Sequence, residues 1–185
     1  MRSCIVKSYT EYDICDIGVP KPVKTQELEE ALKPFACKEV YDKYIRDIDI
    51  RSGNKVSPYD IKASNSISAK IPDSDLIRLF PILKKAFPGL QFRISGQFIY
   101  GPGDGISEHT NANDPTNVIY ITYATGKSKF SYRFSPNNDF IDTYDNINGL
   151  TLRSFVASSN EPFTHHKVEC ESGYRVSIGL RYVQL

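Results

Sequence analysis

Three histidines are present in the chain, and their spacing indicates a metal site. His109 follows a Gly-Pro-Gly-Asp-Gly turn at residues 101–105, which predicts two strands joined by a tight turn, with the histidine on the second strand. His165 and His166 stand ten and nine residues before Arg175. Because a neutral imidazole is the commonest metal ligand in proteins, we expect His109 and one histidine of this pair to bind one metal ion.

A strand predicted over residues 174–183 carries groups that recognise a carboxylate. Arg175 offers a planar, permanently charged guanidinium that can pair with a carboxylate through two hydrogen bonds. Ser177 and Arg181 follow two and six residues later, so both lie on the same strand face as Arg175. We expect Ser177 to add a hydroxyl donor, and Arg181 to reach the other end of a dicarboxylate or to hold Asn111.

Two further motifs carry a family resemblance. Tyr100 stands nine residues before His109, and the stretch from Arg175 to Arg181 reads Arg-x-Ser-x-x-x-Arg. Over residues 94–183 the chain thereby resembles the iron(II)- and 2-oxoglutarate-dependent oxygenases, in particular AlkB-like and prolyl-hydroxylase-like members. The resemblance implies a double-stranded β-helix, with iron(II) as the metal and 2-oxoglutarate as the co-substrate. The residues that it implies for co-substrate binding are Tyr100, Arg175, Ser177 and Arg181.

The same resemblance bears on the choice between the two adjacent histidines. His166 begins a His-Lys-Val sequence that is followed by Gly173 and Arg175, and this is similar to the His-x-Val…Gly-x-Arg pattern of the family. We therefore expect His166 to be the distal metal ligand. His165 remains the alternative.

The third metal ligand departs from the family pattern. Two residues after the first histidine, where these enzymes have a carboxylate, the chain has Asn111. An amide oxygen is neutral and coordinates more weakly than a carboxylate, so we expect a lower affinity for iron. Three interpretations stay open: Asn111 binds the metal, its position is vacant as in the halogenases of the family, or Asp114 replaces it. The first is favoured because it keeps the strand geometry.

The resemblance also implies an activity. The enzyme would hydroxylate a C–H bond and release succinate and carbon dioxide, with no catalytic residues beyond the metal ligands His109, Asn111 and His166. Its substrate stays open among an amino-acid side chain, a small metabolite and a modified base. The alternative function is a jelly-roll binding module that keeps the fold but has lost a competent iron site.

Composition disfavours several classes of binding partner and site. A net charge of +1 over 185 residues disfavours strong nonspecific binding to nucleic acid or to an anionic membrane. The four cysteines form no C-x-x-C pair, which argues against a zinc site. No run of 18 apolar residues occurs, so no spanning helix is expected. We expect a soluble, cytoplasmic protein.

The remaining pattern predicts an α+β, mainly β chain that forms a single domain over residues 1–185. Residues 1–89 form a helix-rich support packed outside, and residues 90–185 form the jelly-roll, cupin-like core. Thr25 is expected to be the N-cap of the first helix. The predicted helices run from Thr25 to Pro34, from 38 to 46 and from 73 to 87. The predicted strands are 63–71, 90–100, 117–124, 129–134, 150–157 and 174–183. The acidic run 139–145 is interpreted as a solvated loop.

Overall fold

The computed structural model describes residues 7–9, 22–44, 46–50, 65–159 and 163–184, and this part of the chain is mainly β-structure. The helices are α1 (Thr25–Leu32), the 3₁₀ helix η1 (Lys33–Phe35), α2 (Lys38–Lys43) and α3 (Asp73–Ala86). The strands are β1 (Lys7–Tyr9), β2 (Arg46–Ile50), β3 (Asn65–Lys70), β4 (Leu90–Tyr100), β5 (Gly105–His109), β6 (Thr116–Ala124), β7 (Ser128–Arg133), β8 (Ile141–Tyr144), β9 (Gly149–Ala157), β10 (His165–Cys170) and β11 (Arg175–Gln184).

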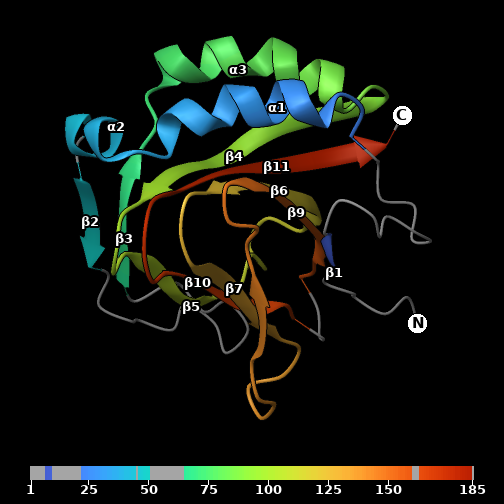
Figure 1. The fold of residues 1–185 in the computed structure, drawn as a ribbon. Helices are drawn as coiled ribbons and strands as arrows, with labels where there is room; N and C mark the ends of the chain where they lie inside the picture. The colour runs from blue at the N-terminus through green and yellow to red at the C-terminus, as the bar shows by residue number, and fades with distance from the viewer. Residues whose placement is uncertain (1–6, 10–21, 45, 51–64, 160–162, 185) are drawn as a thin grey trace.

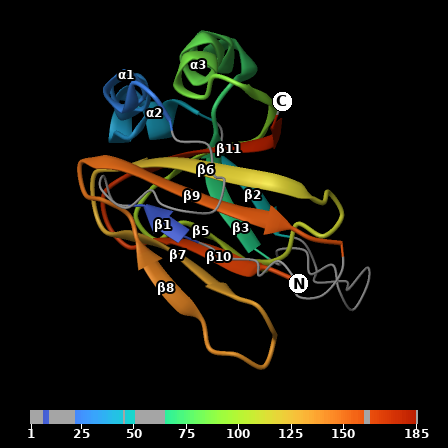
Figure 2. The same ribbon diagram turned by 90° about the vertical axis from the view of Figure 1, so that its right-hand side faces the viewer.

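Strands β4 to β11 pair in a nested order. β4 pairs with β11, β5 with β10, β6 with β9 and β7 with β8, and every pair is antiparallel. The chain therefore runs out and back like one long hairpin that is wound into a helix. Pairing of β11 with β6 and of β10 with β7 joins these ribbons into two sheets, β4-β11-β6-β9 and β5-β10-β7-β8 (Figure 2). This is a double-stranded β-helix, and the predicted fold class is confirmed.

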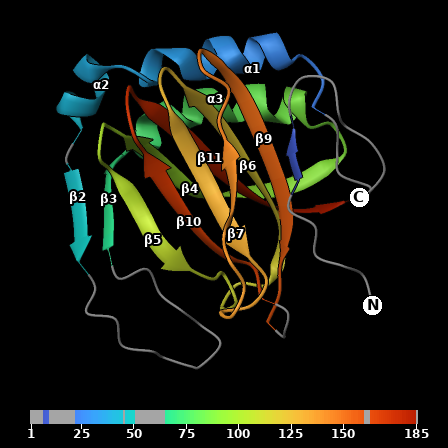
Figure 3. The ribbon, with the colours of Figure 1, turned by 60° about the horizontal axis from the view of Figure 1, so that its bottom comes forward.

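The N-terminal strands extend the edges of the two sheets. β3 lies between them, because Ala69 pairs with Ile99 of β4 while Ser66 pairs with Ile106 of β5. β2 pairs with β3, and β1 pairs with β9 at the other side of the barrel. Figure 3 shows β2, β3, β5, β10 and β7 in this order across the molecule.

Helices α1 and α3 cover the outer face of the β4-β11-β6-β9 sheet (Figure 1). Each helix carries an apolar stripe at helical spacing, and the stripes pack in one cluster with side chains of the sheet. The buried leucines of the two helices are Leu28, Leu32, Leu76, Leu79 and Leu83. A second cluster, rich in aromatic rings, fills the interior between the two sheets. The outer cluster holds the helices in place, and the inner one surrounds the candidate site.

Several boundaries differ from the predictions. Thr25 is the first residue of α1 rather than its N-cap; Lys24, with φ of 58°, precedes it. The second helix ends at Lys43, and Arg46 already belongs to β2. The acidic run contains the strand β8 instead of forming only a loop, since its backbone pairs with β7.

The division of the chain at residue 90 stays a prediction. Residues 51–57, which are polar and for which a turn is expected from the sequence, lie outside the described residues. Among the described helices, none is long and apolar enough to cross a lipid bilayer.

Candidate functional site

His109 and His166 meet inside the barrel. They are the last residue of β5 and the second residue of β10, and they occupy opposite positions in the antiparallel ladder. Their ring centroids are 4.1 Å apart, with the ring planes tilted by 55°. Two segments that are 57 positions apart in the sequence thus bring two imidazoles together, as the metal-site prediction requires.

Both imidazoles are oriented by their own strands. The Nδ1 atom of His109 lies 2.9 Å from the carbonyl oxygen of Ser107, and Nδ1 of His166 lies 3.1 Å from that of Thr164. If Nδ1 carries the proton and donates to the carbonyl, the lone pair of each ring lies on Nε2, which is the usual state of a metal-binding histidine. Burial lowers the pKa of both histidines, and for His166 the neighbouring His109 lowers it further. Both rings are therefore neutral at pH 7.

Asn111 joins the histidine pair. Its Nδ2 atom lies 3.3 Å from Nε2 of His166, and it donates to the hydroxyl of Tyr120 over the same distance. Tyr120 was not predicted as a site residue. Its ring has room because Gly179 stands opposite on β11, where a Cβ atom would come within 2.9 Å of the tyrosine Cε1. We call His109, Asn111 and His166 the histidine end of the barrel interior.

His165 has a different environment from its neighbour. Successive side chains of a strand point to opposite faces, so His165 is turned away from His109. Its Nδ1 atom lies 3.1 Å from the carboxylate of Glu108, at an angle that makes no regular hydrogen bond. The same carboxylate accepts two hydrogen bonds of 2.7 Å from Arg133. Of the two adjacent histidines, His166 is therefore the one that the fold brings to His109.

Asp114 and Arg181 bind each other. Arg181 donates to the backbone oxygen of Asp114 over 2.5 Å, and its Nε atom lies 2.9 Å from the Asp114 carboxylate. Arg93 pairs with the same carboxylate. Asp114 is thus held by two arginines just beyond Asn111. No hydrogen bond or ion pair joins Arg181 to Asn111 among the described residues, and the contact of Arg181 with a dicarboxylate stays a prediction.

Arg175 lies at the opposite end of the interior. It is the first residue of β11 and is 1% exposed, so it is not a surface arginine. Its guanidinium carbon lies 5.2 Å from the ring centroid of Tyr100, the residue paired with it on β4. Its Nη2 atom donates to Thr122 over 3.1 Å, and the Thr122 hydroxyl lies 3.5 Å from that of Ser177. Three of the four predicted co-substrate residues therefore lie together.

Two more charged residues belong to this region, and the sequence analysis missed both. Asp145, from the acidic run, accepts a hydrogen bond of 2.8 Å from Nε of Arg175. Its other carboxylate oxygen pairs with Arg153, whose side chain is fully buried. Burial by itself would raise the pKa of Asp145, but the charges of Arg175 and Arg153 hold that pKa below its ordinary value. We call Arg153, Asp145 and Arg175 the arginine end.

Aromatic rings line the interior between the two ends. Tyr120, Phe130 and Phe155 contact one another, with centroid distances of 5.5 to 6.2 Å. Phe130 stacks on His166 at 5.3 Å. On β11, Gly179, the position beside Tyr120, follows Arg175 by four positions, which is roughly 13 Å of extended strand. The two ends thus lie on opposite sides of a packed aromatic cluster.

The residues fit the implied metal and co-substrate in two respects. At the histidine end, two neutral imidazoles and an amide converge, with Nδ1 of each ring already bonded to a carbonyl. At the arginine end, Nη1 of Arg175 is buried and finds no hydrogen-bond partner among the described residues. Within that part of the chain, no group of three or more His, Cys, Asp and Glu side chains gathers. A metal here would be held by two histidines and a neutral amide.

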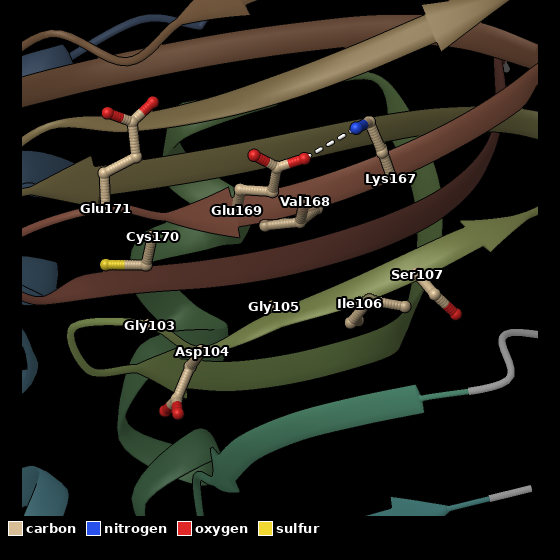
Figure 4. A pocket seen from close by; sticks show the side chains of 10 residues that line it. All are labelled: Gly103, Asp104, Gly105, Ile106, Ser107, Lys167, Val168, Glu169, Cys170 and Glu171. Atoms are coloured by element: carbon tan, nitrogen blue, oxygen red, sulfur yellow. Dashed lines mark hydrogen bonds and ion pairs between the residues drawn. The ribbon is translucent and has the colours of Figure 1, made fainter.

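A separate pocket of about 360 Å³ lies along β5 and β10, close to the turn at Gly103 (Figure 4). The pairing of these strands shifts register between His166 and Val168, and Gly105 lies so close to β10 that a Cβ atom would meet the Val168 carbonyl oxygen at 2.3 Å. Lys167 and Glu169 line the pocket and pair with each other. None of the predicted site residues lines it.

Comparison with known proteins gives structural similarity only. No family model matches the sequence, and no curated protein matches it. The fold is similar to a prolyl-4-hydroxylase of Pseudomonas putida, with 11% identity, a TM-score of 0.47, and coverage of 97% of this chain and 92% of that one. It is also similar to an oxidoreductase of the 2OG-Fe(II) oxygenase family from Burkholderia pseudomallei, with 9% identity, a TM-score of 0.46, and coverage of 86% and 91%. A family 29 carbohydrate-binding module aligns over 52% of this chain and 83% of its own, with 12% identity and a TM-score of 0.32.

Proposed function

We propose that this protein is an iron(II)- and 2-oxoglutarate-dependent dioxygenase. The observation that carries the proposal is the pair of imidazoles at the histidine end, whose ring centroids are 4.1 Å apart and whose Nδ1 atoms each lie within hydrogen-bond distance of a backbone carbonyl. His109, Asn111 and His166 would hold iron(II). Two imidazoles with a third oxygen ligand on one face suit non-haem iron because the remaining positions stay open. His165 and Asp114 are less suited to this role, since His165 lies against Glu108 and Asp114 pairs with Arg93 and Arg181.

The arginine end would hold the co-substrate. Arg175 binds the distal carboxylate of 2-oxoglutarate, with Nη1 as its open donor, and the hydroxyls of Thr122 and Ser177 lie beside it. The face of Tyr100 supports the guanidinium. Arg181 is left out of this set because Asp114 holds it.

When bound, iron(II) supplies the activation of dioxygen that couples decarboxylation of 2-oxoglutarate, to succinate and carbon dioxide, with hydroxylation of the substrate. The chain's own contribution is positioning. Backbone carbonyls orient the two imidazoles, Arg175 would hold one end of the diacid, and the rings of Phe130 and Phe155, which pack against His166, would exclude water there. The substrate class stays open among an amino-acid side chain, a small metabolite and a modified base, and near-neutral charge disfavours the last.

The test is anaerobic addition of iron(II) and 2-oxoglutarate to the metal-free protein. We expect the visible charge-transfer absorption of a 2-oxo acid chelated to iron(II), and slow release of succinate when air is admitted. The matched control is Arg175→Gln, which keeps the metal ligands and should need a far higher 2-oxoglutarate concentration for the same absorption. Absence of the absorption in the wild-type protein at millimolar iron and 2-oxoglutarate contradicts the proposal.

A binding module is the second candidate, and the orientation of Asn111 favours it. The amide donates through Nδ2 to Tyr120 and faces His166 with the same nitrogen, although a metal would need the amide oxygen. A module of this kind binds a diacid in stoichiometric amount, without turnover, and holds no iron after mild purification. The chelate absorption distinguishes the two functions.

A further inference from the structure

The arginine end holds three ionised groups where simple co-substrate binding needs one. Arg153, Asp145 and Arg175 come from three different segments, and their side chains are 0%, 0% and 1% exposed. Two guanidinium groups and one carboxylate leave one net positive charge. An uncompensated charge in a buried site is costly, by several kcal/mol as an order of magnitude, so this cluster is short of one anion.

Hydrogen bonding locates the missing anion at one atom. Each nitrogen of Arg153 has a partner, because Nε and Nη2 donate to the side chain and backbone of Thr143 and Nη1 pairs with Asp145. Arg175 gives Nε to Asp145 and Nη2 to Thr122. Nη1 of Arg175 is the donor without a partner among the described residues.

Asp145 is as fully engaged as Arg153. One carboxylate oxygen pairs with Arg153, and the other accepts hydrogen bonds from Arg175 at 2.8 Å and from Ser128 at 2.5 Å. Its backbone nitrogen donates to the Ser128 carbonyl over 3.0 Å. The carboxylate is therefore fixed in place and cannot leave Arg175 without breaking several bonds. Asp104, the other carboxylate close to Tyr100, is held by Tyr41 and the Gly101 nitrogen.

We propose that Arg153 and Asp145 set the charge of the carboxylate site at Arg175 to +1, so that this site takes one singly charged carboxylate with an affinity that Asp145 limits. The inference rests on the proposed co-substrate pocket. Neither residue touches the ligand: Arg153 raises carboxylate affinity and Asp145 lowers it, both through their charge and through the orientation of Arg175. Without Asp145 the site would carry two positive charges and bind a carboxylate more tightly, and without Arg153 it would be neutral.

The experiment is a charge series on metal-free protein, with glutarate as the probe. Glutarate has the two carboxylates of 2-oxoglutarate but lacks the oxo group that iron chelates. Its affinity is measured by titration calorimetry for wild type, Asp145→Asn, Arg153→Gln and the double variant. Their net charges at the site are +1, +2, 0 and +1. Arg175→Gln is the control for binding elsewhere.

We expect Asp145→Asn to bind glutarate roughly tenfold more tightly than wild type, and Arg153→Gln roughly tenfold more weakly. The double variant should return to within about threefold of wild type, because charge is restored without the original contacts. Asp145→Asn should also unfold at a lower denaturant concentration. If Asp145 had a purely structural role, Asp145→Asn would be less stable than wild type and would also bind glutarate more weakly.

Several outcomes overturn the inference: equal affinities across the series, weaker binding by Asp145→Asn, or no glutarate binding by wild type. If Asp145→Asn does not fold, Arg153→Gln and the double variant still decide, since only the first should lose affinity. The iron(II) and 2-oxoglutarate absorption is measured in parallel. If the absorption appears but glutarate affinity does not follow the net charge of the site, this inference is wrong and the proposed dioxygenase function is retained. If the absorption is absent but glutarate affinity follows the net charge, the dioxygenase function is wrong and the inference about the charged site is retained.

Discussion

The two ends of the barrel interior balance their charges in different ways. At the histidine end, His109, Asn111 and His166 are all neutral, and the fold orients them through backbone carbonyls and Tyr120. At the arginine end, Arg153 and Arg175 are permanently charged, and the fold supplies a carboxylate between them. The first end can receive a cation at little cost to the metal-free protein, whereas the second depends on its internal anion even before a ligand arrives. Stability should therefore be concentrated at the arginine end and metal affinity at the histidine end.

The largest expected effect is on stability, from Asp145→Ala. This change leaves two buried guanidinium groups side by side without a counterion, and we expect a loss of about 3–5 kcal/mol in the free energy of unfolding, measured by urea denaturation. Asp142→Ala is the matched control. Asp142 lies three residues earlier and pairs with Lys129 near the surface, so about 0–1 kcal/mol is expected there. Similar small losses in both variants would show that the arginine end does not carry the stability.

The second prediction separates the adjacent histidines. His166→Ala should weaken binding of manganese(II), a redox-stable substitute for iron(II), by more than about 100-fold, since loss of a ligand exceeds the 10–100-fold typical of an outer partner. His165→Ala removes a side chain that faces Glu108 and should change this affinity by less than about tenfold. Titration calorimetry measures both, after circular dichroism confirms folding. Equal losses in the two variants would contradict the assignment of His166.

The third prediction concerns pH and the metal-free protein. The pKa values of His109, His165 and His166 are all lowered from 6.5, with burial as the largest cause. Below pH 6.5 the unfolded chain therefore binds protons that the folded chain does not. The contribution of these histidines to the free energy of unfolding is fully present above that pH. It falls as pH decreases, by at most about 1.4 kcal/mol per pH unit for each histidine.

Urea denaturation at pH 7.5 and 5.5 measures this loss. The interval avoids carboxylates with ordinary pKa values, which titrate near pH 4. A variant with both His109→Asn and His166→Asn should lose less stability between the two pH values than wild type. A wild-type stability that is equal at both, or higher at pH 5.5, would contradict the buried neutral state of the histidine end.

The smallest expected effect comes from adding a negative charge at the histidine end alone. Asn111→Asp adds a carboxylate beside His166, and we expect affinity for manganese(II) to rise by about tenfold, because the new ligand is anionic. Glutarate binding at the arginine end should change by less than about threefold, given the roughly 13 Å of strand between them. If metal affinity falls, Asn111 is not positioned as a ligand.

Much of the fold was predictable because it depends on short-range patterns. Strand-like runs bounded by turn residues predicted β4 over 90–100 and β11 over 174–183, and the helical spacing of apolar residues predicted α3 despite Pro81. Strand β8 (Ile141–Tyr144) was missed because the acidic run 139–145 that contains it looks like a solvated loop. In the structure Asp142 pairs with Lys129 while Asp145 turns inward, a difference that local composition does not encode.

The sequence by itself determined which side chains share a strand face, because that face repeats every two residues; this is why Arg175 and Ser177 were recognised as partners. Only the tertiary structure decided that His166 faces His109 while His165 faces Glu108, and that Arg181 is bound to Asp114. The tertiary structure also decided that Asp145 forms ion pairs with both Arg153 and Arg175. The physical reason is that strand register and barrel closure fix which remote segments meet, and a buried charge is stabilised by whichever partner that closure brings within hydrogen-bonding distance.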